Sequence, residues 1–161
     1  MIDELAGDNN MKRLSTSIAG WMFLMGLVPA WADEQAELVF VRRVLPMLQE
    51  KCLACHGNDP KEFQGGLDLR TRESTVRGGE SETPALIPGR PENSPLYLAV
   101  TRTSEDWSAM PPKEADQLTE PQIRWLREWI AGGSPWPDAQ QIREIMHTHA
   151  PKWSVEDGIK V

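Results

Sequence analysis

The chain has 161 residues, and its 24 acidic against 17 basic side chains give it a net charge of −7 at pH 7. This balance argues against a nucleic-acid-binding protein, because domains that bind nucleic acid carry basic surfaces that neutralise phosphates. An acidic surface is compatible with a basic protein partner, although charge by itself says nothing about the fold.

Residues 1–32 have the layout of a secretory signal peptide. The basic pair Lys12-Arg13 precedes an apolar run of eleven residues, 18–28, and a small-x-small cleavage site ends at Ala32. The ten residues before Met11 hold three acids and no base, so we expect Met11 to be the true start. Cleavage would leave a chain of 129 residues, the length of one domain. Its net charge would be −6, because three acids and two bases leave with the signal.

An uncleaved membrane anchor is the alternative for this segment. A membrane-spanning helix needs about 20 apolar residues, whereas this run is shorter and ends at Pro29. No cysteine follows the run, which excludes a lipid anchor there. We therefore expect a periplasmic or otherwise exported protein that meets the membrane only through its export signal.

The mature chain is expected to begin with a helix over residues 35–45. Apolar side chains recur there at helical spacing, at Val41, Val44, Leu45 and Leu48. Pro46 lacks a backbone donor and clashes with the preceding turn of a helix. We therefore predict a break or kink at Leu45-Pro46, followed by a short helix over residues 46–55.

That short helix carries the most informative motif of the chain, Cys52-Leu53-Ala54-Cys55-His56. This spacing is the attachment signature of a c-type haem. The two thiols can form thioether bonds to the haem vinyl groups, and the adjacent histidine can supply one axial ligand to the iron. Cys52 and Cys55 are the only cysteines in the chain, so the motif predicts one covalently attached haem c.

Two other sites use closely spaced cysteines. A zinc site needs about two more Cys or His ligands, and the remaining histidines, His147 and His149, lie some ninety residues away. A thioredoxin-like redox pair occurs near a βαβ pattern, and none is recognisable in the sequence. The histidine that directly follows Cys55 favours the haem.

Residues 57–95 are rich in Gly and Pro and predict a long loop region. Within it we expect a short extended piece at residues 67–69 and a single helical turn at residues 72–76. Long loops in small domains usually have a function, and wrapping a cofactor would be one. Asn93 or Ser94 is then expected to cap a helix that runs through Val100.

A haem iron that only carries electrons usually takes a sixth ligand, and three methionines and two histidines of the mature chain are available: Met47, Met110, Met146, His147 and His149. Met47 is expected in the core, since it lies on the same helix as Cys52. Met110 precedes Pro111 and Pro112, which hold the backbone extended in a loop that can present a thioether. Sulfur is a soft ligand that raises the reduction potential. Met110 is our predicted ligand, and the tail residues and an open site are the alternatives.

The C-terminal part of the domain predicts a helix over residues 120–131. Thr119 and Gln122 form a capping box, and Gly132-Gly133 ends the helix. Its apolar stripe should pack against the first helix. Trp125 and Trp129 form a neighbouring stripe, which either packs between helices or contacts the haem edge. Residues 138–161 are a polar tail in which a short helix over residues 139–146 is compatible with the sequence.

Several stretches resemble the planctomycete-type cytochrome c domain. They are VLPML at 44–48, KCLACHG at 51–57, GGLDLRTRE at 65–73, IPGRPENS at 87–94, MPPK at 110–113, LT at 118–119, QI at 122–123, WI at 129–130 and GSPWP at 133–137. The resemblance covers roughly residues 38–137 and implies an all-α cytochrome c fold, and we assign residues 33–137 to this domain. It also implies Cys52 and Cys55 as thioether anchors, with His56 and Met110 as axial ligands.

In that family the domain commonly opens a much larger exported protein, whereas here 24 residues follow residue 137. A free-standing carrier and a truncated longer protein are both compatible with this length.

The combined prediction is a small all-α domain of about three to five helices with long loops, wrapped around one covalent haem. We expect a monohaem c-type cytochrome that transfers one electron at a time between exported protein partners. No general base, nucleophile or phosphate-binding loop suggests an enzyme. A haem-based redox or gas sensor, or an interaction module of a larger exported enzyme complex, is the alternative. Arg70, Arg72 and Arg90 are either partners of the haem propionates or solvated loop residues.

Overall fold

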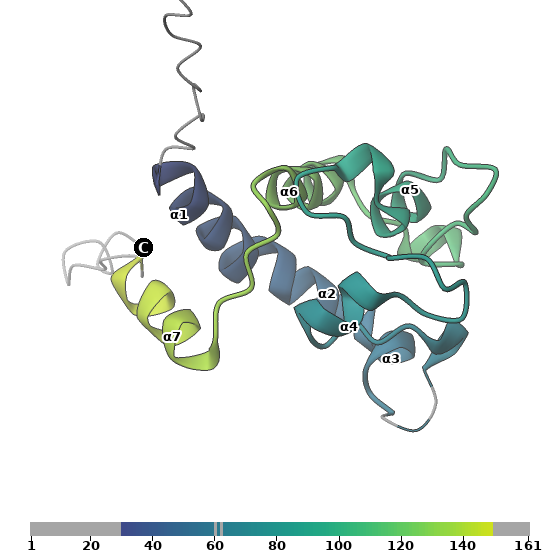
Figure 1. Ribbon diagram of the computed structural model, residues 1–161, viewed down its shortest axis with the longest axis horizontal. Helices are drawn as coiled ribbons and strands as arrows, with labels where there is room; N and C mark the ends of the chain where they lie inside the picture. The colour runs from purple at the N-terminus through teal and green to yellow at the C-terminus, as the bar shows by residue number, and fades with distance from the viewer. Residues whose placement is uncertain (1–29, 60, 62, 150–161) are drawn as a thin grey trace, which may run out of the picture.

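The computed structural model describes residues 30–59, 61 and 63–149, all in helices and loops (Figure 1). The predicted all-α class is confirmed. Within these residues no helix is both long enough and apolar enough to cross a membrane. Most of the predicted signal peptide lies outside the described residues. Its expected cleavage site, Ala32, falls in the backbone of the first helix, α1 (Ala30–Val39).

The chain stays helical where a break was expected. After α1 comes a π-helical segment, Phe40–Val44, and then α2 (Leu45–Lys51) with Pro46 in its first turn. The Leu45 N–H donates to the Phe40 carbonyl, five residues back, in the wider turn that defines a π-helix. This widening directly precedes Pro46, whose ring would clash with a regular α-helical turn. The interruption falls instead at Cys52, whose φ of −120° separates α2 from α3 (Leu53–His56).

The C-terminal helix α6 (Glu120–Ala131) has the predicted bounds, and both hydrogen bonds of the predicted capping box are present. It packs against α1 and the π-helical segment, as the two apolar stripes predict. Phe40 stacks on Trp129 with ring centroids 5.4 Å apart. The approach is close because residue 132 is glycine: a Cβ there would lie 2.5 Å from the Ala36 Cβ.

The most deeply buried side chains come mainly from these same segments, joined by Leu86 of the loop region. They include Phe40, Val44, Leu86, Leu126, Trp129 and Ile130, each at most 1% exposed. Burial of this apolar surface is the main favourable term in folding. The core therefore forms along the contact between the first and the last helix of the predicted domain.

The loop region between these helices contains two short helices at the predicted places. The helix α4 (Arg72–Arg77) follows Thr71, whose hydroxyl caps it, and α5 (Pro95–Thr101) follows Ser94. The Ser94 hydroxyl does not cap α5. It is fully buried, donates to the Arg90 carbonyl at 2.9 Å and accepts from the Ile87 N–H at 2.9 Å. This side chain therefore ties the start of α5 to the loop before it.

The polar tail begins with the helix α7 (Ala139–Thr148), capped by Asp138. Ile142 and Ile145 are partly buried against the core, whereas Met146 is 52% exposed. In Figure 1 α7 lies on the other side of the molecule from α3. The tail thus contributes one amphipathic helix to the outside of the core.

The two tryptophans of α6 have different environments, which predicts different effects on stability. Trp129 is fully buried and its indole N–H donates to the Pro135 carbonyl at 2.8 Å, whereas Trp125 is half-buried beneath the Arg43 guanidinium. We expect Trp129→Phe to lower the free energy of unfolding by about 2 kcal/mol, through lost volume and an unpaired carbonyl. Trp125→Phe should cost less than about 1 kcal/mol. Urea unfolding of both variants checks this, and equal losses would contradict it.

Candidate functional site

Cys52, Cys55 and His56 lie together where α2 passes into α3. The Cys52 N–H donates to the Leu48 carbonyl at 2.9 Å, which joins the segment to the end of α2. The Cys52 carbonyl then accepts from the N–H groups of Cys55 and His56, at 3.2 and 3.0 Å. One turn of chain thus carries both thiols and the imidazole, and it is anchored to a helix that is buried through Met47 and Leu48.

The two thiols are free and half-buried. Burial, with a smaller contribution from Cys55, raises the pKa of the Cys52 thiol to about 11. At neutral pH Cys52 is therefore a protonated thiol rather than a thiolate. Unpaired, partly accessible thiols are what covalent attachment of a group at this turn would require.

His56 is held by two hydrogen bonds to one extended piece of chain. Its Nδ1–H donates to the Leu67 carbonyl at 3.2 Å, and its own carbonyl accepts from the Leu69 N–H at 2.9 Å. A carbonyl only accepts, so Nδ1 carries a proton, and in the neutral imidazole Nε2 then keeps its lone pair. An imidazole fixed in this tautomer by a backbone carbonyl is prepared to bind a metal through Nε2.

The piece that holds His56 is itself held by an ion pair. Both Asp68 oxygens accept from the Arg70 guanidinium, at 3.0 and 2.9 Å, and Asp68 Oδ1 also accepts from the Arg70 N–H at 2.9 Å. The guanidinium lies over the Phe63 ring, 4.9 Å from its centroid. Arg70 is therefore engaged with its own loop. These contacts rigidify the backbone between Leu67 and Leu69, the two residues that bond to His56.

This ion pair predicts a pH effect. The side-chain hydrogen bond from Arg70 lowers the pKa of Asp68 below its usual 3.8, so the carboxylate stabilises the fold above that pH. This contribution is lost as the pH falls through the lowered pKa of the folded state. We expect Asp68→Asn to lower the melting temperature by a few degrees at most at pH 7, and the difference from wild type to shrink toward pH 3. Thermal melts across this range check it, and a difference that grows toward acid would contradict it.

Met110 lies in the loop between α5 and α6 and is half-buried. Its N–H donates to the Ala99 carbonyl of α5 at 3.0 Å, and the carbonyl of the following Pro111 accepts from Arg102 Nη1 at 3.0 Å. Trp107, in the same loop, is also half-buried. Neither side chain belongs to the hydrophobic core formed by the described residues. They are apolar surface that a large planar group could cover.

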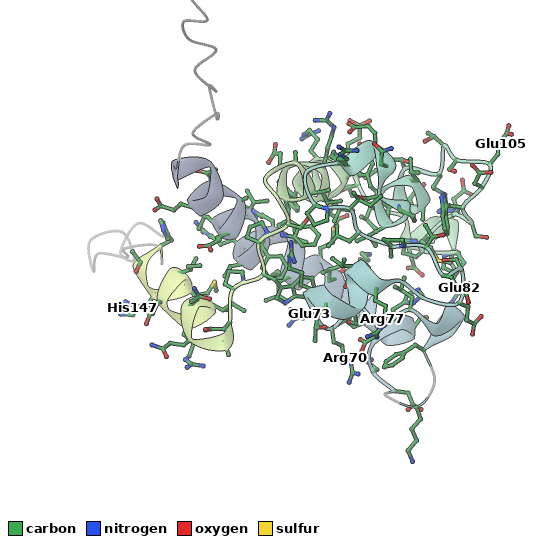
Figure 2. The ribbon with its side chains drawn as sticks, viewed as in Figure 1. Arg70, Glu73, Arg77, Glu82, Glu105 and His147 are labelled. Atoms are coloured by element: carbon green, nitrogen blue, oxygen red, sulfur yellow. The ribbon has the colours of Figure 1, made fainter. Side chains whose placement is uncertain are left out.

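The other candidates for the sixth iron ligand lie in the core or on the exposed tail helix. Met47 is 3% exposed and belongs to the core, as expected. Met146, His147 and His149 are exposed and lie on α7 or at its end. Figure 2 shows His147 at the left edge of the molecule, apart from Arg70, which follows the piece of chain that holds His56. The structure therefore brings Cys52, Cys55 and His56 together and places the tail candidates far from them.

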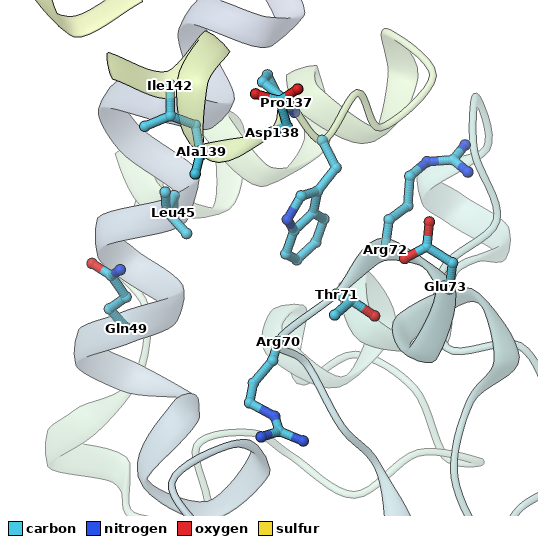
Figure 3. Close-up of a pocket in the computed structure, with 11 residues that line it drawn as sticks. Leu45, Gln49, Arg70, Thr71, Arg72, Glu73, Pro137, Asp138, Ala139 and Ile142 are labelled. Carbon is cyan, nitrogen blue, oxygen red and sulfur yellow. The ribbon is translucent and has the colours of Figure 1, made fainter.

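A cavity of about 500 Å³ lies between α2, residues 70–73 and residues 136–142 (Figure 3). Its main polar groups already have partners in the fold. Arg72 Nε donates to the Ser134 carbonyl at 3.0 Å, and Asp138 Oδ1 accepts the N–H groups of Gln140 and Gln141 that begin α7. Arg72 is thus a structural link between the loop region and the segment after α6. We do not assign the haem to this cavity.

The residues present fit a covalent haem. Two free thiols and an imidazole with a fixed tautomer lie in one turn, and half-buried apolar side chains stand beside it at Leu53 and Leu67. The side-chain part of this site was recognisable from the motif. The role of the Leu67 carbonyl could not be predicted from the sequence. Every residue has a backbone carbonyl, and no side chain indicates which one accepts the hydrogen bond from His56.

Comparison with known proteins agrees with this site. Residues 52–114 match the family model described as Planctomycete cytochrome C. The matched segment begins at Cys52 and includes His56, the Leu67–Leu69 piece and Met110. Curated proteins and solved structures give no significant match. Proteins of the cytochrome c type carry electrons by means of haem. Over residues 52–114 the chain is therefore similar to the planctomycete-type cytochrome c domain, the family that its motifs resemble.

Proposed function

We propose that this protein is a monohaem c-type cytochrome that carries one electron at a time between exported redox partners. The observation that carries the proposal is the single turn that holds Cys52, Cys55 and His56, with His56 oriented by the Leu67 carbonyl. The chain has no third cysteine. One attachment motif supports one covalent haem.

Each residue of the site has a distinct role in this proposal. Cys52 and Cys55 would hold the haem by thioether bonds and keep it bound in both oxidation states. His56 Nε2 and the Met110 thioether would bind its iron. The Leu67 carbonyl keeps the His56 proton on Nδ1 and so keeps Nε2 available. The haem iron supplies the one-electron chemistry, and the protein sets its potential and its exposure.

Export and partner choice are also part of the proposal. The haem-attachment motif follows a segment with the layout of a signal peptide, residues 1–32, and haem c is attached outside the cytoplasm. With a net charge of −6 after cleavage at Ala32, the exported chain favours a basic redox partner through long-range steering. Mass spectrometry of the exported protein tests the cleavage, and the mature chain should begin at or near Asp33.

A redox titration of the exported holoprotein tests the function. We expect a single haem absorption change that follows a one-electron Nernst curve, and a ferrous protein that does not bind carbon monoxide. Both follow from one haem whose sixth position is occupied by Met110. A ferrous protein that binds carbon monoxide readily would instead favour a sensor with an open sixth position. More than one haem per chain would contradict the monohaem proposal.

A further inference from the structure

We propose that Arg102 is the positioning residue that holds Met110 in place, through the carbonyl of Pro111. This inference rests on the proposed role of Met110 as an axial ligand. It concerns how the protein keeps that ligand within reach, which the attachment motif does not explain.

The sequence around Met110 is difficult to anchor through its backbone. Pro111 and Pro112 have no N–H groups, so this stretch can donate no backbone hydrogen bond. The Met110 N–H is the last donor before them, and it is used on the Ala99 carbonyl. The backbone of the two prolines can therefore be hydrogen-bonded only through its carbonyls.

Arg102 supplies such a donor. Its Nη1 donates to the Pro111 carbonyl at 3.0 Å, and the side chain is half-buried rather than solvated. Met110 is therefore bracketed, with its own N–H bonded to Ala99 and the next carbonyl bonded to Arg102. Both partners belong to the last turn and the end of α5, so the loop is tied to one rigid element at two consecutive residues.

The backbone of Arg102 supports a specific role. It has φ 59° and ψ 23°, the left-handed conformation in which helices commonly end and which glycine adopts with least strain. An arginine here is disfavoured by its Cβ. The strained backbone is compensated by a side chain that starts at the end of α5 and reaches the proline pair.

The helix that carries Arg102 is a firm base. Leu96 and Val100 of α5 are buried in the core, and the fully buried Ser94 ties its first turn to the preceding loop. The Met110 loop is hydrogen-bonded to this helix at two points, so the helix fixes the position of the loop. Without Arg102, the bond from the Met110 N–H to the Ala99 carbonyl would remain, but the Pro111 carbonyl would lose its donor.

The test uses Arg102→Gly, Arg102→Lys and a matched control, Glu82→Gly. Glu82 is also a non-glycine residue with positive φ, 56°, but it is exposed and lies outside the Met110 loop. Both glycine variants relieve the same backbone strain. Only Arg102→Gly removes the donor to Pro111, so strain relief and loss of the anchor can be separated.

We expect imidazole to bind the ferric Arg102→Gly holoprotein about tenfold more tightly than wild type, because losing one charge-assisted hydrogen bond weakens the competing Met110 by about that factor. Hydrogen exchange at the Met110 amide should accelerate, while the urea midpoint stays unchanged or rises. Arg102→Lys should fall between wild type and glycine, since a lysine keeps one donor but not the planar fork. Glu82→Gly should leave both imidazole affinity and Met110 exchange unchanged.

The outcomes separate this inference from the function on which it rests. A thioether bound to ferric iron gives a weak sulfur-to-iron charge-transfer band in the absorption spectrum. If Met110→Ala removes this band but Arg102→Gly changes neither the imidazole affinity nor the Met110 amide exchange, Met110 is the ligand and Arg102 does not position it. Equal effects of Arg102→Gly and Glu82→Gly would also overturn the inference, by assigning the change to the backbone. If Met110→Ala leaves the band intact, the ligand assignment and the role of Arg102 both fail.

Discussion

Replacing Met110 with alanine is expected to abolish the weak sulfur-to-iron charge-transfer band near the red end of the ferric spectrum. The thioether is the only group in that side chain that can bind iron, and alanine leaves the sixth position open. The ferrous variant should therefore bind carbon monoxide, and the ferric variant should bind imidazole. Absorption spectra of the two oxidation states, with and without the added ligands, measure both effects.

Met110→His provides the complementary variant. The iron should stay low-spin, because imidazole also binds strongly, but the reduction potential should fall, since a thioether favours the ferrous state more than imidazole does. Met146→Ala, His147→Ala and His149→Ala are the controls. These side chains are exposed on α7 or at its end, so their removal should change neither the band nor the potential. A band that survives Met110→Ala and disappears with a tail variant would contradict the assignment.

Removing both thiols should have the largest effect on the yield of holoprotein. With Cys52 and Cys55 replaced by alanine, no thioether can form, and acid-acetone extraction should strip all haem from the chain. Each single variant should keep at most one thioether bond, with a reduced yield of holoprotein. Mass spectrometry of the extracted chains distinguishes covalent from dissociated haem.

The two single variants are each other's controls, since the two thiols lie in the same turn. Burial raises the pKa of the Cys52 thiol to about 11, so its thiolate is scarce at neutral pH. Both sulfurs must nevertheless react for full attachment. Covalent haem recovered from the double variant would show that the motif is not the attachment site, and the proposed function would fail with it.

The helices whose ends are fixed by interactions between neighbouring residues were predicted well from the sequence. The capping box at Thr119 and Gln122 acts within four residues, and α6 begins and ends where its pattern predicts. The short helix α4 is likewise capped by its neighbour Thr71. Helices defined by longer-range context were predicted less well. The π-helical segment before Pro46 could not be predicted from helix propensity, because it depends on how a continuous helix accommodates the proline ring.

The amphipathic stripe of α6 was visible in sequence, but the places of its two tryptophans were not. Trp129 is buried against Phe40 while Trp125 lies at the surface beneath Arg43. Helical spacing alone puts both on the same stripe. The direction from which α1 approaches α6 decides which one is covered, and that direction depends on the close contact at Gly132.

The sequence by itself determined the residue types that the proposed chemistry requires: the two thiols and the imidazole at Cys52, Cys55 and His56, and a thioether before two prolines. These are side-chain identities at short spacing, which a sequence displays directly. Only the tertiary structure decided how they are held, by the Leu67 carbonyl on His56, the Ala99 carbonyl on the Met110 amide and Arg102 on Pro111. Two of these three contacts end on a backbone carbonyl of an ordinary residue, and the third joins an arginine to a proline carbonyl nine residues away. Backbone carbonyls are the same at every position, so only folding selects the ones that hold the site.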